Sequence, residues 1–467
     1  MATNPGFGLR DRVLWLVVVV TTAVRLFFAW RFFGFLGGDD VEVLEEAFRR
    51  ACGLAFQPWN IRCLLVPDVL VAPVVRLGVA GGANDTGTLV FLAAVPFVLL
   101  ASVNVVLVYS LAMRWGGERT VARTAAAIYA FHWLPLAFGS TVYPRTAATT
   151  CVLLAAIWVS GTGRDLARGL AAGAAISVAF AERYSEGLFL LPLLHLCLTA
   201  GGAKGPARRA MGLVAGFALG TGVAVGLYDL LTWGRLFASL VAFAKLTVVE
   251  GTYSSRVATQ SSFFYLERVL YWLPPTLLPG LPLTLKNRGF LPAWAFLAAP
   301  VAVLSCVPHK ELRYLQGAIP FLALLGAAGL AALRRRWRPL LVTALVVLTV
   351  ASEALGVRVL TGKSMAAVAA ARSIARDRSV RVVALSQAWA YGDRLYLGNL
   401  VEVRDLATPP DFTELEGRIP GADRVALYGR DLANDAALGA LLMRRGFSRD
   451  VRFRWGGSKP VVVFSRN

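Results

Sequence analysis

The chain has 467 residues, of which 57% are hydrophobic and 16% are charged, and its formal net charge is +20. Such a low share of charge cannot cover the surface of a soluble protein of this size, so the composition excludes that class. The sequence has no basic strip interleaved with aromatic residues outside its loops, which excludes nucleic-acid binding. The positive charge is better explained by the cytoplasmic loops of a membrane protein.

Apolar stretches of about twenty residues, the length that crosses a bilayer as a helix, recur from residue 12 to residue 357. They predict an α-helical polytopic membrane protein. Arg10 and Arg12 precede the first stretch, and basic residues in that position favour a cytoplasmic N-terminus. The loop charges then indicate about eleven spans with every inner loop basic. The predicted spans are residues 13–36, 88–112, 122–140, 146–160, 169–181, 187–200, 210–232, 268–285, 289–307, 314–333 and 339–357.

Residues 60–80 are predicted to lie at the membrane interface as amphipathic segments and not to cross the bilayer. Pro67 and Pro73 interrupt this stretch, and Asp68 adds charge within it. Counting it as a span would reverse the topology of every later segment. The basic run at residues 334–338 would then lie outside, against the rule that basic loops stay in the cytoplasm.

The composition changes near Lys363, where strand-like alternation replaces the long apolar runs. We therefore predict a transmembrane domain over residues 1–362 and a small α/β domain over residues 363–467. The odd number of spans places the second domain on the outer face. Its predicted elements are strands at residues 380–385, 401–406 and 424–428, a helix at 434–445, and a hairpin formed by 451–455 and 460–464.

The predicted topology brings charged clusters from distant parts of the chain to the outer face. The first lies in residues 37–46, which directly follow the first span and hold five acids. Each cluster taken alone is equally well explained as a helix-end anchor, but four clusters on one face, several with both signs of charge, favour a site. They are Asp39-Asp40 with Glu46, Tyr143-Pro144-Arg145, Glu182-Arg183, and His309-Lys310-Glu311 with Arg313 and Tyr314.

These residue types suit group transfer from a membrane-bound phosphate. Arg and Lys hold a phosphate leaving group by charge-assisted hydrogen bonds, and a nearby carboxylate can deprotonate an incoming hydroxyl. The sequence has neither a GxxxxGK[ST] pattern nor a Rossmann glycine pattern, so a nucleotide donor is not indicated. With three histidines and no Cys/His ligand spacing, a His-built metal site is not expected.

The run His309-Lys310-Glu311-Leu312-Arg313-Tyr314 resembles the His-Lys-Glu-x-Arg-aromatic signature of glycosyltransferase family twenty-two, within the GT-C superfamily. These are integral-membrane mannosyltransferases that build GPI anchors and dolichol-linked oligosaccharides. The family also carries an acidic pair with a Glu seven residues after the first acid, and Asp39, Asp40 and Glu46 match it. The usual pair is Asp-Glu, so Asp40 departs from the pattern. The resemblance covers most of residues 10–335.

The resemblance implies a GT-C fold and an inverting transfer of mannose from a polyprenyl-phosphate sugar to a glycan or glycolipid acceptor. Asp39 would be the general base, with Asp40 and Glu46 orienting the acceptor, or Asp40 would be the base. No cofactor is implied, and a divalent metal at the acidic pair is not expected. His309 would bind a phosphate oxygen or make a structural hydrogen bond at a helix start. The residues implied to bind substrate are Arg145, Arg183, His309, Lys310, Glu311, Arg313 and Tyr314.

Two further expectations concern the localisation and the partners. The Ala- and Arg-rich composition and the appended domain favour a bacterial inner membrane over the endoplasmic reticulum. The expected partners are the lipid-phosphate donor, the acceptor and membrane lipid.

The main alternative function is a transporter or flippase of lipid-linked saccharides. Transporters usually place charges near the bilayer midplane, often in repeated halves, whereas these charges lie at the outer rim. A membrane-anchored scaffold, a third function, would leave the rim charges unexplained.

Overall fold

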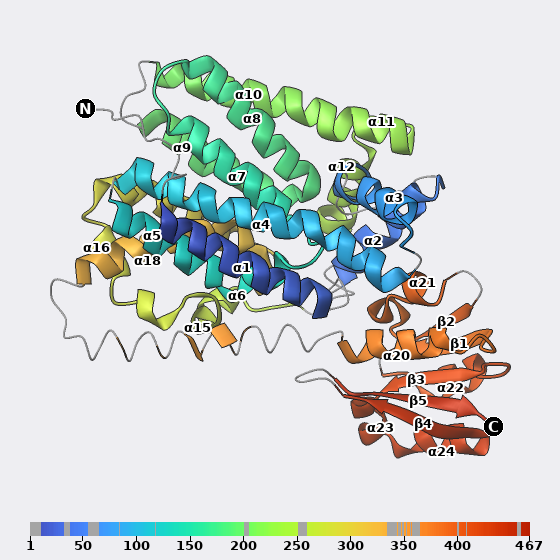
Figure 1. The fold of residues 1–467 in the computed structure, drawn as a ribbon. Coiled ribbons are helices and arrows are strands. Elements are labelled where there is room, and N and C mark those ends of the chain that lie inside the picture. The colour runs from blue at the N-terminus through green and yellow to red at the C-terminus, as the bar shows by residue number, and fades with distance from the viewer. Residues whose placement is uncertain are drawn as a thin grey trace.

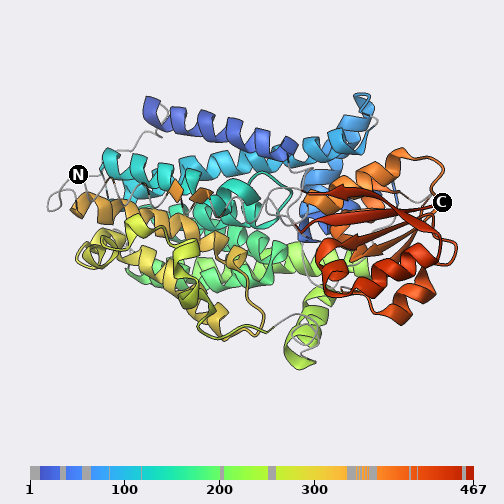
Figure 2. The ribbon, with the colours of Figure 1, turned by 90° about the horizontal axis from the view of Figure 1, so that it is seen from below.

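The computed structural model is a helical bundle with a small sheet domain at one end (Figures 1 and 2). It describes residues 11–31, 38–54, 65–83, 85–116, 118–199, 205–250, 259–333, 365–398, 401–407, 409–454 and 459–467, and scattered positions between 343 and 356. The helices before the sheet domain, with 3-10 and π helices labelled η, are α1 (Arg12–Arg31), α2 (Gly38–Ala51), η1 (Val66–Val71), α3 (Ala72–Ala80), α4 (Thr86–Gly116), α5 (Arg119–Phe131), α6 (Trp133–Phe138), α7 (Arg145–Val159), α8 (Asp165–Glu182), η2 (Tyr184–Phe189), α9 (Leu190–Thr199), α10 (Pro206–Thr221), η3 (Gly222–Leu227), α11 (Tyr228–Trp233), α12 (Ala238–Ala244), η4 (Lys245–Val249), α14 (Phe264–Glu267), α15 (Val269–Trp272), η5 (Pro275–Leu277), α16 (Leu281–Thr284), η6 (Arg288–Phe290), α17 (Leu291–Cys306), η7 (Leu312–Ala318) and α18 (Ile319–Leu333).

Five helical stretches in the described residues are long and apolar enough to cross a membrane, and each overlaps a predicted span. This is the pattern of an integral membrane protein. The stretches are Arg12–Arg31, Thr86–Gly116, Pro206–Trp233, Arg288–Cys306 and Leu312–Leu333, with shorter apolar helices at Arg145–Val159, Tyr184–Thr199 and Ala238–Thr247. The total of eleven spans stays a prediction, and the last predicted span, 339–357, lies almost entirely outside the described residues.

Two predicted spans are not continuous helices. The span at 122–140 divides at His132, whose extended backbone ends α5 and whose ring nitrogen accepts the N–H of Leu134 to begin α6. The span at 268–285 was wrong as one helix: it forms α15, η5 and α16, because Pro274 and Pro275 lack the N–H that a continuing helix needs. Residues 66–80 form two short helices, η1 and α3.

Helices α8 and α10 approach unusually closely, because each carries two glycines four residues apart on the shared face. A Cβ added at Gly173 would lie 2.2 Å from the carbonyl oxygen of Leu213, and one added at Gly212 would lie 2.5 Å from that of Leu166. Small residues at this spacing let helix backbones touch in a membrane. The contact sets the position of α8, which leads into the candidate site described below.

The sheet domain contains five strands in the order β2-β1-β3-β5-β4. Strand β1 pairs in parallel with β2 and β3, and β5 pairs antiparallel with β3 and β4. The predicted strands, helix and hairpin are confirmed, with shifted ends. The elements are α20 (Met365–Arg376), β1 (Val382–Ser386), η8 (Ala388–Tyr391), α21 (Asp393–Tyr396), β2 (Glu402–Leu406), α22 (Phe412–Arg418), β3 (Arg424–Tyr428), α23 (Gly429–Asn434), α24 (Ala436–Arg444), β4 (Phe447–Phe453) and β5 (Val461–Arg466).

The sheet domain and the bundle share one hydrophobic cluster. It joins Val383 and Leu385 of β1 and the buried side of α20 to Val41 and Leu44 of α2. Burying one such side chain contributes about 1.5–3 kcal/mol, so the shared cluster is a substantial interface. Helix α2, which carries the acidic residues singled out in the sequence, therefore packs against both parts of the protein, and Figure 1 shows it beside α21.

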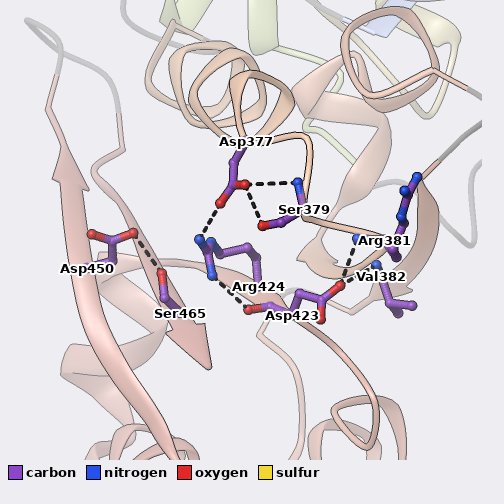
Figure 3. Close-up of polar contacts among 8 residues, drawn as sticks. All are labelled: Asp377, Ser379, Arg381, Val382, Asp423, Arg424, Asp450 and Ser465. Carbon is purple, nitrogen blue, oxygen red and sulfur yellow. Dashed lines mark hydrogen bonds and ion pairs between the residues drawn. The ribbon is translucent and has the colours of Figure 1, made fainter. Parts of the chain in front are cut away.

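A polar cluster secures the sheet domain where β1 and β3 begin (Figure 3). The carboxylate of Asp423 accepts the backbone N–H groups of Arg381 and Val382 at 2.7 and 2.9 Å. Arg424 donates to Asp377 at 2.7 Å, and Asp377 also accepts from Ser379. The two backbone N–H groups hold the pKa of Asp423 below its usual value, because they stabilise the charged form.

We expect Asp423→Asn to speed hydrogen exchange at the N–H groups of Arg381 and Val382 near neutral pH, because a neutral amide is a weaker acceptor than a carboxylate. The lowered native pKa means that this stabilisation is present above the unfolded value of about 3.9 and is lost as the pH falls through the native value. The difference between variant and wild type should therefore shrink in acid. Exchange rates are compared with those of unstructured peptides at each pH.

The control is Asp450→Asn, which weakens the acceptor for the hydroxyl of Ser465 and lies in the edge strand β4, away from the start of β1 (Figure 3). It should leave exchange at the start of β1 unchanged. Identical protection in wild type and Asp423→Asn near neutral pH would contradict the assignment.

Candidate active site

A short buried segment between α6 and α7 forms one side of the candidate site. Residues 140–146 are all buried, and α7 begins at Arg145 directly after Pro144, whose fixed φ suits a helix start. Arg145 is 4% exposed and forms an ion pair with Glu186. It also donates to the hydroxyl of Ser185 at 2.9 Å and to the backbone oxygen of Tyr314 at 3.3 Å.

The second side comes from the end of α8. The chain leaves that helix at Arg183, whose backbone is extended, and turns into η2. This turn places Ser185 and Glu186 against Arg145, with Glu186 1% exposed. The extended residue between the two helices thus separates the acid that ends α8, Glu182, from the acid that reaches the site.

Three arginines of the candidate site lie beside two tyrosine rings. Arg183 and Arg313 both lie 5.7 Å from the ring centroid of Tyr143, and Arg145 lies 5.0 Å from that of Tyr314. These distances are within the range of attraction between a cation and an aromatic ring. The structure therefore brings together residues from three of the four clusters that the sequence placed on one face.

The His-Lys-Glu motif precedes η7, the short helix that continues into α18. Glu311 pairs with Arg313, and its other carboxylate oxygen lies 3.4 Å from Nε2 of His309. The His309 ring packs edge-on against Tyr314, with centroids 5.9 Å apart. One carboxylate thus holds both a guanidinium and an imidazole beside the tyrosine that Arg145 contacts.

Lys310 is directed differently from its neighbours. Its side chain is 3% exposed, and Nζ donates to the backbone oxygen of Gln260 at 3.1 Å. The backbone N–H of Gln260 in turn donates to the carbonyl of Pro308 at 2.9 Å. Lys310 therefore ties the motif to residues 259–262, and its expected contact with a lipid phosphate stays a prediction.

The acidic helix α2 reaches the site through Asp40. This side chain is 1% exposed, and one of its oxygens accepts a long hydrogen bond, 3.5 Å, from the hydroxyl of Thr141. Thr141 belongs to the buried segment 140–146 that also carries Tyr143 and Arg145. Asp39 is in α2 as well, but its side chain lies outside the described residues.

The remaining acids of α2 are more enclosed than expected. Glu46 is buried, one helical turn before Arg50, which pairs with Asp68 at 2.6 Å. From the sequence we expect Glu42 and Glu45 to be exposed to solvent on a short helix. Both are half-buried, because α2 packs against the bundle and the sheet domain.

A buried polar network that the sequence did not indicate supports the segment 140–146. Asn104 of α4 donates to the backbone oxygen of Thr146 at 3.3 Å, and Gln316 of η7 donates to its hydroxyl at 3.1 Å. Both amide side chains are 1% exposed or less. The network holds the first turn of α7, and so Arg145, between α4 and η7.

The acid that reaches the site is not the one that the sequence grouped with Arg183. The sequence singled out Glu182 with Arg183, but Glu182 accepts the backbone N–H groups of Leu65 and Val66, at 3.0 and 3.1 Å, and so secures the start of η1. Glu186 is the acid that meets Arg145. The sequence signal for Glu186 was its position directly after Ser185 and three residues after Arg183, which is one turn of η2.

Among the described residues, no group of three His, Cys, Asp or Glu side chains could hold a metal ion. The expectation of a reaction without metal or cofactor stays a prediction.

We expect Glu186→Leu to lower the free energy of unfolding by about 3–5 kcal/mol, because it leaves Arg145 buried without its counter-charge. Replacing both residues, Arg145→Met with Glu186→Leu, should recover much of that loss. Denaturant unfolding in detergent micelles measures both. The matched control is Glu416→Leu, which breaks an exposed pair with Arg445 and should cost about 1 kcal/mol or less. Equal costs for the two single variants would show that burial of the Arg145 pair carries no extra energy.

The sequence matches the Alg9-like mannosyltransferase family over residues 55–378, well over half of the chain. Comparison with curated proteins gave no match.

Solved structures share the fold at low sequence identity. ArnT from Cupriavidus metallidurans, bound to undecaprenyl phosphate, is 14% identical with a TM-score of 0.62, covering 96% of this chain and 98% of that one. The oligosaccharyltransferase of Archaeoglobus fulgidus, in complex with Zn and sulfate, is 11% identical with a TM-score of 0.53, covering 93% and 71%. A structure of the archaeal oligosaccharyltransferase AglB from Archaeoglobus fulgidus, with an inhibitory peptide and a dolichol-phosphate, is 10% identical with a TM-score of 0.50, covering 94% and 73%. Together with the family match, these likenesses show a GT-C fold. The small C-terminal sheet domain is formed by β1–β5.

Proposed function

Since this chain belongs to the Alg9-like mannosyltransferase family and is a membrane glycosyltransferase, we propose that it transfers mannose, with inversion, from a polyprenyl-phosphate donor to a lipid-linked or glycan acceptor. The observation that carries the proposal is the convergence of Arg145, Arg183 and Arg313 on two tyrosine rings. They lie beside the segment that contacts Asp40. Membership of a mannosyltransferase family favours sugar transfer over the alternative function of a transporter or flippase.

The arginines suit a lipid-phosphate donor. Guanidinium groups bind phosphate through paired, charge-assisted hydrogen bonds, and three of them could neutralise the charge that develops on a departing polyprenyl phosphate. The lipid phosphates named for the ArnT and AglB structures support a donor of this class. His309 would add a hydrogen bond to a phosphate oxygen, with Glu311 orienting its ring.

The acids of α2 suit the proton transfer. In an inverting reaction the acceptor hydroxyl attacks the anomeric carbon, the bond from that carbon to the phosphate oxygen breaks, and polyprenyl phosphate leaves. The hydroxyl proton passes to a carboxylate, which Asp39 or Asp40 would supply. Glu46 would support the acceptor side, and Tyr314, between Arg145 and His309, would shape the donor side.

We expect substitution of the base, Asp39→Asn or Asp40→Asn, to reduce sugar transfer at least about 100-fold, since an amide cannot accept the proton. The assay uses membranes that contain the variant and synthetic polyprenyl-phosphate mannose, with protein amount measured by immunoblot. Glu45→Gln, on the same helix and half-buried, is the control and should retain activity. Wild-type rates in both aspartate variants would overturn the assignment of the base to this pair.

The donor sugar is tested by product analysis. Purified enzyme with a panel of polyprenyl-phosphate hexoses should yield a mannosylated product with inverted anomeric configuration. Preferential use of another hexose would refute the mannose assignment while leaving the lipid-phosphate donor in place.

We further propose that the N-terminus is cytoplasmic and that the sheet domain and the site face the outside of a bacterial inner membrane. Reporter fusions after residues 205 and 460 should then report opposite sides of the membrane. Fusions that report the same side would contradict this topology.

A further inference from the structure

Arg25 is a buried arginine inside α1, a helix long and apolar enough to cross a membrane. The residue is 0% exposed. Its Nη2 donates to the backbone oxygen of Ala130 at 3.2 Å, while Nε and Nη1 have no hydrogen-bond partner in the part of the chain that the structure describes. A charge enclosed within a membrane protein is costly, so its surroundings must explain how it is held there.

The surroundings of Arg25 hold the carboxyl end of a helix in place of an acid. Within the described residues no ion pair joins it to a carboxylate, whereas Arg209 of α10, which is equally buried, pairs with Asp165. Ala130 lies in the last turn of α5, whose terminal carbonyls carry a partial negative charge that compensates the guanidinium in part. Stability does not account for Arg25, because replacing a buried charge with an apolar side chain of similar size is often neutral or stabilising.

Arg25 also lies beside the far end of α6, the helix that follows α5. Helix α1 packs against both α5 and α6 (Figure 1). Gly139 caps α6, and a Cβ built on it would lie 3.4 Å from Nε of Arg25 and 2.5 Å from the carbonyl oxygen of Pro135. The guanidinium therefore lies next to the chain on both sides of α6, at Ala130 before that helix and at Gly139 after it.

A second route leads from Arg25 to the other end of the buried segment 140–146. Tyr129 is 1% exposed and lies within electrostatic reach of Arg25 and beside the side chain of Asn104. Asn104 donates to the backbone oxygen of Thr146. Arg25 is thus connected to the segment both where it begins, after α6, and where it ends, at the start of α7.

We propose that Arg25 is a positioning residue, whose charge fixes the segment 140–146 by holding α6 against the end of α5. This segment carries Thr141, whose hydroxyl reaches Asp40, and Arg145, which begins α7. A shift of about 1 Å in groups that orient substrate can cost about 100-fold in rate, so loss of the charge would be felt in catalysis. This catalytic consequence rests on the proposed function, but the effect on the segment does not.

The first arm of the test measures hydrogen exchange in the purified full chain in detergent. The backbone N–H groups of Ser140 and Thr141 donate to carbonyls at the end of α6, so their exchange reports how firmly the segment is held. Arg25→Met should exchange about tenfold faster there without unfolding at lower denaturant concentration. Arg25→Lys, which keeps the charge, should recover part of the protection.

The second arm measures the kinetics of sugar transfer from polyprenyl-phosphate mannose. Arg25→Met should lower kcat about tenfold and leave KM for the donor within about twofold, because the residue does not touch the donor. Arg25→Lys should again lie between the variant and wild type. The matched control is Thr21→Val, a buried residue one turn earlier on α1 whose hydroxyl bonds only to carbonyls of its own helix, and it should behave like wild type in both arms.

Wild-type exchange at Ser140 and Thr141 in Arg25→Met would overturn the proposal. Unfolding of Arg25→Met at clearly lower denaturant concentration would overturn it as well, because it would assign Arg25 a role in stability alone. Equal behaviour of Arg25→Lys and Arg25→Met would refute the part played by charge. Absence of transfer by the wild-type protein would instead refute the proposed function, and the exchange arm would still decide the role of Arg25.

Discussion

The candidate site depends on the buried ion pair between Arg145 and Glu186. Neither charge could remain in this environment alone, since an uncompensated buried ion costs several kcal/mol. Arg145 begins α7 and Glu186 lies in η2, beyond the end of α8. The same guanidinium donates to the backbone oxygen of Tyr314 in η7. One side chain therefore fixes three segments that are far apart in sequence, and the tyrosine rings and remaining arginines are arranged around it.

The position of α2 follows a different rule. Its acids are polar, but the helix is held by apolar contacts, with Val41 and Leu44 in a cluster that includes β1 of the sheet domain. An ion pair between Arg50 and Asp68 fixes the C-terminal end of α2. Asp68 also accepts the hydroxyl of Tyr228 at 2.7 Å. The location of Asp40 beside Thr141 consequently depends on how the sheet domain docks, which gives that domain a part in shaping the site.

Much of this organisation was accessible from sequence because it rests on local signals. Long apolar stretches predicted the five span-length helices, and period-two alternation predicted the strands, with β3 at residues 424–428 as expected. The grouping of Arg145, Arg183, Arg313 and Tyr314 followed from loop charge, which depends on topology and not on packing.

What the sequence missed depends on contacts between distant segments. The choice of Glu186 over Glu182 is decided by one extended residue, Arg183, which no periodicity reveals. The support from Asn104 and Gln316 is likewise tertiary, because an isolated amide in an apolar helix has no pattern of its own. Hydropathy predicted one span at 268–285, because the residues stay apolar even where prolines interrupt the helix.

The pairing of Arg145 and Arg313 with carboxylates is compatible with binding a phosphate because of the geometry of the guanidinium group. Arg carries five N–H donors in a rigid plane, so one guanidinium can bind several acceptors at once, as Arg145 binds Glu186, Ser185 and the backbone oxygen of Tyr314. In the proposed reaction the carboxylate would hold the guanidinium in place before substrate arrives, and so would limit reorganisation during the reaction. An ammonium group lacks this planar arrangement of donors, and Lys310, with its Nζ directed to the carbonyl of Gln260, helps to hold the motif in position. The same chemistry that makes these arginines costly to bury alone thus makes them suitable, once paired, to receive a lipid phosphate.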